Sequence, residues 1–407
     1  MVFSQGVCCG DDAYHAMVAK NLAEGRGYAS SLPIGQTHST LTLFDPLLGT
    51  GPTMILPTAL MIALFGNAYW VPGLTNVIIW SALILCIGVV LNRIVSNKVG
   101  LTISVVLFFL FAYLFTAYHF ELWYALFGDI PTALLIILAI LIYFFHDSKI
   151  YLAITGVLFS LAFESKMVAV LPFITFILFI VLYHLITNRY QLKTAIKKIF
   201  SQLLFILIGF CIPIFLFEAY RVISLHRHGY LVYWQQAIEY IRTAGVVANK
   251  SLLTTISERT DLAIRRFGLF LPIIFPILAY LGYVLWSDKR LLAIYIAFAG
   301  LIVVYTFYWL VLSEGWARYF VISLILFVFA LALPFTSDTL KTKFKVIYAI
   351  VLAGLIFYNM SSIDTLIQFR TPQLFRPSSS TRAMSRCRAP GSRVRRSTSI
   401  SPLRGAR

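Results

Sequence analysis

Charged residues are scarce in this sequence, and that scarcity excludes most soluble globular folds. Only 12% of the 407 residues are charged, whereas 60% are apolar. A soluble domain carries about 25% charged residues, because its surface must be solvated by water. The composition therefore predicts an integral membrane protein.

Several motifs of soluble enzymes and nucleotide-driven transporters are also missing. The sequence has no Gly-x-x-x-x-Gly-Lys-Ser/Thr loop, no Gly-x-Gly-x-x-Gly after a strand and no His-Glu-x-x-His. Its five cysteines show neither Cys-x-x-Cys spacing nor a disulfide framework. No cofactor is expected, and the motifs do not indicate a metal ion.

Apolar runs near twenty residues recur along the chain, the length that crosses hydrocarbon as a helix. They predict an all-α fold, a polytopic bundle of about ten transmembrane helices. We expect spans near 73–95, 99–118, 131–146, 150–163, 167–187, 199–217, 268–286, 291–312, 317–336 and 344–360. The 150–163 run is short and is followed directly by Glu164, Ser165 and Lys166. Broken segments of this kind are tolerated where they line a cavity enclosed by protein.

Basic residues mark one side of the predicted bundle. The loops on that side hold twelve basic residues and three acidic ones, Asp147, Asp288 and Asp338. The basic residues are Arg93, Lys98, Lys149, Arg189, Lys193, Lys197, Lys198, Lys289, Arg290, Lys341, Lys343 and Lys345. By the positive-inside rule this side is cytoplasmic, so region 1–72, the 119–130 turn and the 218–266 loop face outward.

The chain divides into three parts. Region 1–72 is an external loop with two short helices, one starting at Asp11-Asp12 and one at Pro52, and both are too short to span the membrane. Region 73–360 is the transmembrane bundle. Region 361–407 includes the C-terminal segment from Arg376 to Arg407, which contains nine arginines and no acidic residue. The abrupt change of composition there favours a disordered or out-of-frame extension over an arm for nucleic acid or anionic lipid.

Two stretches of the external loop carry a resemblance to a known family. The runs GDDAYHAMVAKNLAEGRGY and TGPTMILPTALMIALFG resemble the first external loop of GT-C glycosyltransferases. These include the protein O-mannosyltransferases and the bacterial lipid A aminoarabinose and galacturonic acid transferases. The resemblance extends more weakly to about Tyr319. It implies transfer of a sugar from a polyprenyl-phosphate donor to a lipid, glycan or protein acceptor outside the cytoplasm, at the bacterial inner membrane and without nucleic acid.

The resemblance also implies the site residues. The family's acidic pair falls on Asp11 and Asp12, with Asp11 as the candidate base that deprotonates the acceptor. Asp129, in Gly-Asp-Ile-Pro, matches the acid of the next external turn. Lys166 matches a Ser-Lys or Thr-Lys turn, with Glu164 as its candidate ion-pair partner.

The last two matches, Arg318 and Tyr319, correspond to the Arg-Tyr that opens a late span of the family. Lys166 and these two residues would hold the lipid phosphate. Plain structural alternatives are helix caps for Asp11, Asp12 and Asp129, and interfacial anchors for Lys166 and Arg318.

Three departures from the family pattern stand out. Members often have a further helix before the acidic pair, and many carry a folded external domain at the C-terminus; neither pattern is present in this sequence. Aminoarabinose transferases have a Lys where Gly51 stands here. Two other functions stay open. One is a secondary transporter or flippase. The other is a polysaccharide polymerase or ligase, which the arginines of the 218–266 loop would also suit.

Overall fold

The computed structural model describes residues 10–34, 38–46, 48–94, 128–187, 190–244, 252–267, 270–313, 317–337, 344–348 and 350. All of them belong to one unit, Met1–Ile356. The second unit, Phe357–Arg407, lies outside the described residues, and so do the predicted span 99–118 and most of 344–360.

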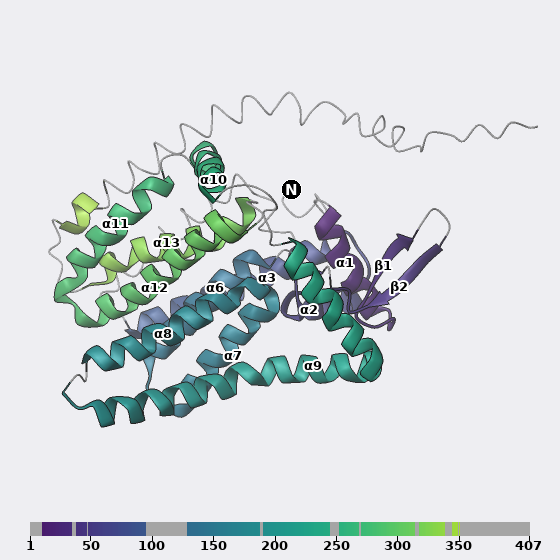
Figure 1. Ribbon diagram of the computed structural model, residues 1–407, viewed down its shortest axis with the longest axis horizontal. Helices are drawn as coiled ribbons and strands as arrows, with labels where there is room; N and C mark the ends of the chain where they lie inside the picture. The colour runs from purple at the N-terminus through teal and green to yellow at the C-terminus, as the bar shows by residue number, and fades with distance from the viewer. Residues whose placement is uncertain are drawn as a thin grey trace, which may run out of the picture. The chain divides into compact units, whose positions relative to one another are not determined.

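Helices make up nearly all of the described chain (Figure 1). In chain order the elements are α1 (Gly10–Ala23), β1 (Ala29–Ile34), β2 (His38–Leu43), α2 (Pro52–Phe65), α3 (Val71–Ile94), α6 (Asp129–Phe145), α7 (Lys149–Ser165), the 3-10 turn Met167–Ala169, α8 (Val170–Thr187), α9 (Leu192–Ala244), α10 (Leu252–Phe267), α11 (Phe270–Val284), the 3-10 turn Leu285–Ser287, α12 (Lys289–Phe307), the π-helical turn Tyr308–Leu312 and α13 (Ala317–Thr336).

In the part of the chain that the structure describes, four helical segments are long and apolar enough to cross a membrane, namely Val71–Arg93, Met167–Thr187, Leu192–Glu239 and Lys289–Leu312. Shorter apolar helices occupy Pro52–Phe65, Asp129–Phe145, Phe275–Ser287 and Phe320–Thr336. The segments Val71–Arg93, Met167–Thr187 and Lys289–Leu312 agree with predicted spans to within a few residues, because the length of an apolar run is a local property of the sequence. Leu192–Glu239 extends well beyond the predicted span 199–217 at both ends. The chain is thus an integral membrane protein, and the total of about ten spans stays a prediction.

The two short helices predicted in region 1–72 are present as α1 and α2. Helix α2 begins with Pro52 in its first turn and ends before Gly66, whose φ of +79° favours glycine. Between the helices, the chain forms an antiparallel hairpin that the sequence analysis did not predict. Its strands pair from Ala29 opposite Leu43 to Ile34 opposite His38.

The predicted span 199–217 is part of a longer helix, and the described residues of the predicted loop 218–266 are helical. Helix α9 continues without a loop from its membrane-spanning part to Ala244, and α10 follows at Leu252. A sharp kink interrupts α9 at His226, where φ is +54° and ψ is 173°. The kink turns the last part of α9 back beside α1 and α2 (Figure 1).

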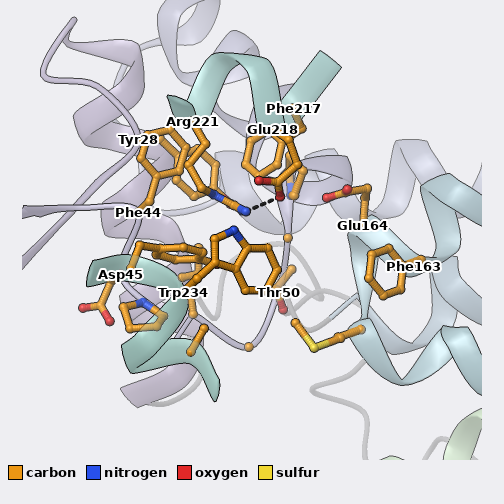
Figure 2. A pocket seen from close by; sticks show the side chains of 18 residues that line it. Tyr28, Phe44, Asp45, Thr50, Phe163, Glu164, Phe217, Glu218, Arg221 and Trp234 are labelled. Atoms are coloured by element: carbon orange, nitrogen blue, oxygen red, sulfur yellow. Dashed lines mark hydrogen bonds and ion pairs between the residues drawn. The ribbon is translucent and has the colours of Figure 1, made fainter. Parts of the chain in front are cut away.

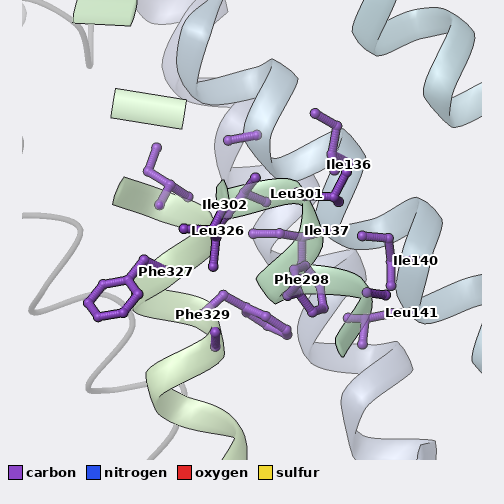
Figure 3. Packing of buried hydrophobic residues seen from close by; sticks show 14 of the residues in the cluster. Ile136, Ile137, Ile140, Leu141, Phe298, Leu301, Ile302, Leu326, Phe327 and Phe329 are labelled. Atoms are coloured by element: carbon purple, nitrogen blue, oxygen red, sulfur yellow. The ribbon is translucent and has the colours of Figure 1, made fainter. Parts of the chain in front are cut away.

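The apolar core lies where α6, α12 and α13 meet (Figure 3). Side chains of α6 such as Ile137 and Ile140 are fully buried against α12 and α13, including Phe298 and Leu326. Because α6 is buried on nearly every side, its N-terminus at Asp129 is held in a fixed position.

Helices α7 and α9 contact each other backbone to backbone. A Cβ atom added at Gly156 would lie 2.0 Å from the carbonyl oxygen of Ile206, and one added at Gly209 would lie 2.0 Å from that of Ala153. Small residues permit this close approach between helices in a membrane. The contact fixes α7 and α9 side by side.

Candidate active site

The break between α7 and α8 is the point on which the site is built. Lys166 leaves the helical conformation, with φ of −145° and ψ of 117°, and the 3-10 turn Met167–Ala169 follows. The N–H of Gly51 donates to the carbonyl of Ser165 at 3.2 Å, and the hydroxyl of Thr53 donates to Leu161 O at 2.8 Å. The start of α2 is therefore attached directly to the break.

No side chain fits at Gly51. A Cβ atom there would lie 1.9 Å from the carbonyl oxygen of Glu164, a distance that only a backbone shift could relieve. This contact explains the glycine where the aminoarabinose transferases have a Lys. It also presses the backbone of Glu164 against the start of α2.

Lys166 pairs with Asp129 and not with Glu164. Its Nζ atom lies 3.7 Å from Oδ2 of Asp129, and both side chains are buried, with 7% and 1% of their surfaces exposed. Nearby, the Ser165 hydroxyl donates to the Gly128 carbonyl at 3.1 Å. The cap residue of α6 is Gly128, so Asp129 is a partner of Lys166 and not the helix cap that the sequence left open.

A pocket of about 190 Å³ lies on the other side of this break (Figure 2). Three parts of the chain line it: the segment from the hairpin to α2, the end of α7, and α9 on both sides of its kink. The lining residues are Tyr28, Phe44, Asp45, Pro46, Leu48, Gly49, Thr50, Gly51, Pro52, Phe163, Glu164, Met167, Phe217, Glu218, Arg221, Tyr233, Trp234 and Ala237.

Arg221 is the only basic residue among the described residues that line this pocket. Its guanidinium carbon lies 4.3 Å from the ring centre of Tyr233 and 4.9 Å from that of Phe217. The rings of Phe44 and Trp234 lie at 5.5 and 5.8 Å. Four aromatic rings thus hold the cation in place and exclude water from it. The kink at His226 is what brings Tyr233 and Trp234 to Arg221.

Glu218 is the ion-pair partner of Arg221, one helical turn earlier on α9. Its other carboxylate oxygen accepts a hydrogen bond from the Tyr230 hydroxyl at 3.1 Å. The Nε of Arg221 is buried and has no hydrogen-bond partner in the described part of the chain. Arg221 therefore retains a buried donor within the pocket wall.

The carboxylate of Asp45 is held by hydrogen bonds from α1 and β1. The hydroxyls of Tyr14 and Ser30 both donate to its Oδ2 atom, the latter at 2.8 Å. The carboxylate points away from Arg221 in Figure 2. Burial and the adjacent Asp45 together raise the pKa of Tyr14, so that this phenol stays protonated and acts as a donor.

The structure places three of the site residues predicted from the sequence and leaves the side chains of the other three undescribed. Asp129 and Lys166 lie together at the break, and Asp12 is buried in the first turn of α1. The side chains of Asp11, Arg318 and Tyr319 lie outside the described part of the chain. Among the described residues, no three His, Cys, Asp or Glu side chains form a group suited to a metal ion.

Sequence reasoning missed the role of Arg221 in the pocket and named it only among the arginines of an external loop. A usable signal was present: Glu218 and Arg221 have the i, i+3 spacing of a helical ion pair at the end of an apolar run. The contribution of Tyr233 and Trp234 left no such signal, because it depends on the kink.

No family model matches the sequence, and neither does any curated protein. Among solved structures, ArnT from Cupriavidus metallidurans in the apo state is similar, with a TM-score of 0.52 and 12% identity over 85% of this chain and 58% of ArnT. ArnT bound to undecaprenyl phosphate gives a TM-score of 0.52 and 15% identity over 86% and 59%. An oligosaccharyltransferase from Archaeoglobus fulgidus gives a TM-score of 0.47 and 14% identity over 88% and 52%.

The likeness to ArnT shows a shared fold. ArnT is a GT-C glycosyltransferase, so the fold implied by the sequence resemblance is confirmed. The chain spans 58–59% of the length of the two ArnT structures.

Proposed function

We propose that this protein is a glycosyltransferase that moves a sugar from a polyprenyl-phosphate donor to an acceptor on the extracytoplasmic face. The observation that carries the proposal is Arg221, a buried cation in an aromatic-walled pocket beside the α7–α8 break. The shared fold with an ArnT structure that holds undecaprenyl phosphate supports a lipid-linked donor.

Arg221 is assigned to the donor phosphate. A guanidinium makes charge-assisted hydrogen bonds to phosphate oxygens, and these are stronger where water is excluded. Lys166, Arg318 and Tyr319 are assigned as further phosphate contacts from the family pattern. Binding by Lys166 would draw on the same ammonium group that now pairs with Asp129.

Asp11 is assigned as the base, with Asp12 and Asp129 orienting the acceptor or supporting positive charge in the transition state. The acceptor oxygen attacks the anomeric carbon, and its proton passes to the Asp11 carboxylate. The bond from the anomeric carbon to the phosphate oxygen breaks, and its electron pair stays on the phosphate. The oxocarbenium-like charge that develops on the sugar favours carboxylates nearby.

The location follows from the distribution of charge in the loops. With the basic loops on the cytoplasmic side, Glu164, Lys166 and Asp129 lie at external ends of helices. We assign the protein to a bacterial inner membrane, with membrane lipids around it and a lipid, glycan or protein as the acceptor.

The test is transfer by the purified, membrane-reconstituted protein from a panel of polyprenyl-phosphate sugars, read as the free lipid phosphate released. Arg221→Ala should lower donor affinity by at least about tenfold, since a hydrogen bond to a charged group contributes about 1.5–3 kcal/mol. Arg227→Ala removes an exposed arginine of the same helix and serves as the matched control. The proposal would be contradicted if no donor in the panel released lipid phosphate, or if Arg221→Ala and Arg227→Ala bound the donor with equal affinity.

A further inference from the structure

The pocket carries more negative than positive charge. Besides Arg221, the described lining residues include the carboxylates of Glu218, Glu164 and Asp45. Glu218 pairs with Arg221, and Asp45 is held by Tyr14 and Ser30. The carboxyl group of Glu164 has neither a hydrogen bond nor an ion pair to any described residue. With all of these groups ionised, an entering phosphate would meet a net negative pocket and be repelled.

Glu164 is positioned to meet whatever binds at Arg221. Its backbone is pressed against Gly51, and its side chain is partly buried and points from α7 toward the Arg221–Glu218 pair (Figure 2). The residue lies beyond the predicted 150–163 span and outside the segments long enough to cross the membrane. Its carboxyl therefore forms the pocket wall opposite the cation.

The surroundings of Glu164 favour its neutral form. Burial raises its pKa to about 7; Arg221 opposes this shift, and Glu218 adds to it. Lys166, two residues further on, is engaged with Asp129. The charged or titratable groups that face Glu164 are Glu218, Arg221 and Tyr233 from α9, and Tyr28 from the segment before α2. Asp45 also lines the pocket, but its carboxylate is turned toward Tyr14 and Ser30.

We propose that Glu164 contacts the donor phosphate as the neutral carboxylic acid, donating a hydrogen bond to one phosphate oxygen while Arg221 contacts another. The inference rests on the proposed function and adds a binding residue to it. A neutral carboxyl removes one negative charge from the pocket and supplies a donor, whereas a carboxylate can only accept. Binding of the donor above neutral pH therefore takes up one proton from solution.

The experiment measures affinity for a synthetic undecaprenyl methyl phosphodiester in detergent micelles between about pH 6 and about pH 9. The probe keeps a single negative charge over this range, so a change in affinity reports on the protein. For the wild-type protein, the affinity should fall by up to about tenfold per pH unit above the pKa of Glu164. Calorimetry at about pH 8 in two buffers of different ionisation enthalpy should show uptake of close to one proton.

The variant Glu164→Gln keeps a hydrogen-bond donor of similar size and cannot ionise. It should bind the probe at high pH about as tightly as the wild type does at low pH, with little dependence on pH. Glu24→Gln, an exposed change outside the pocket, should keep the wild-type profile.

The outcomes separate the two proposals. Wild-type binding that does not vary with pH, or that takes up no proton, overturns the role of Glu164 and leaves the transferase proposal standing. A full pH dependence in Glu164→Gln overturns it as well. No binding of the phosphodiester at any pH overturns both.

Discussion

Lys166 Nζ lies 3.7 Å from Asp129 Oδ2 in a buried ion pair that connects the α7–α8 break to the first turn of α6. The pair joins two residues that the sequence assigned to different tasks, phosphate binding and catalysis. Removing one partner of a buried pair leaves an uncompensated charge, whereas replacing both can be nearly neutral.

Lys166→Met should therefore destabilise the fold by about 3–5 kcal/mol, and the double variant Lys166→Met/Asp129→Leu should recover much of that loss. Thermal unfolding in detergent measures both. If the stable double variant still binds the polyprenyl phosphodiester, Lys166 is a structural residue and its assignment to the phosphate is withdrawn. Weak binding by the double variant supports the phosphate contact.

Gly51→Ala should impair the protein although it adds only one methyl group. The new Cβ would lie 1.9 Å from the carbonyl oxygen of Glu164, so that either α2 or the break must move, at about 1–3 kcal/mol. Gly88→Ala on α3 is the control, since its Cβ would meet no atom within 4 Å. Equal melting temperatures and donor affinities in both variants would show that the contact at Gly51 is not tight.

Asp11→Asn tests the assignment of the base. Asparagine keeps the size of the side chain without its charge, and residue 11 lies inside the first turn of α1, so the helix should persist. Loss of a general base lowers the rate by about 10²–10⁴, and the turnover of lipid-linked sugar should fall accordingly. Asp12→Asn and Asp129→Asn are measured alongside. If all three variants transfer sugar at the full rate, the carboxylates have structural roles only and a transporter becomes the better hypothesis.

Sidedness is tested with topology reporters. A reporter fused after Lys198 should report the cytoplasm, and one inserted near Lys250 should report the exterior, because the positive-inside rule places the basic loops in the cytoplasm. The reverse result at both positions would place Arg221 and Glu164 on the cytoplasmic side. The proposal of an extracytoplasmic polyprenyl-phosphate donor would then fail.

The sequence predicted several helices well, α9 only in part and the pocket poorly, for a physical reason. The length of a continuous apolar run such as 317–336 directly predicts the length of the helix, and α13 spans the same residues. The pairing of Lys166 with Asp129 depends on how distant helices pack, which no local pattern records. The enclosure of Arg221 depends on the backbone turn at His226, a residue type that does not signal a kink.

The close approach of α7 and α9 also sets the width of the pocket. Gly156 and Gly209 determine the separation of the two helices, and the same helices carry Glu164 and Arg221 into the pocket. At 1.5 Å per residue, Glu164 lies about 12 Å along α7 from Gly156, and Arg221 lies about 18 Å along α9 from Gly209. A methyl group inserted at Gly156 would therefore change the gap between carboxyl and guanidinium without touching either residue.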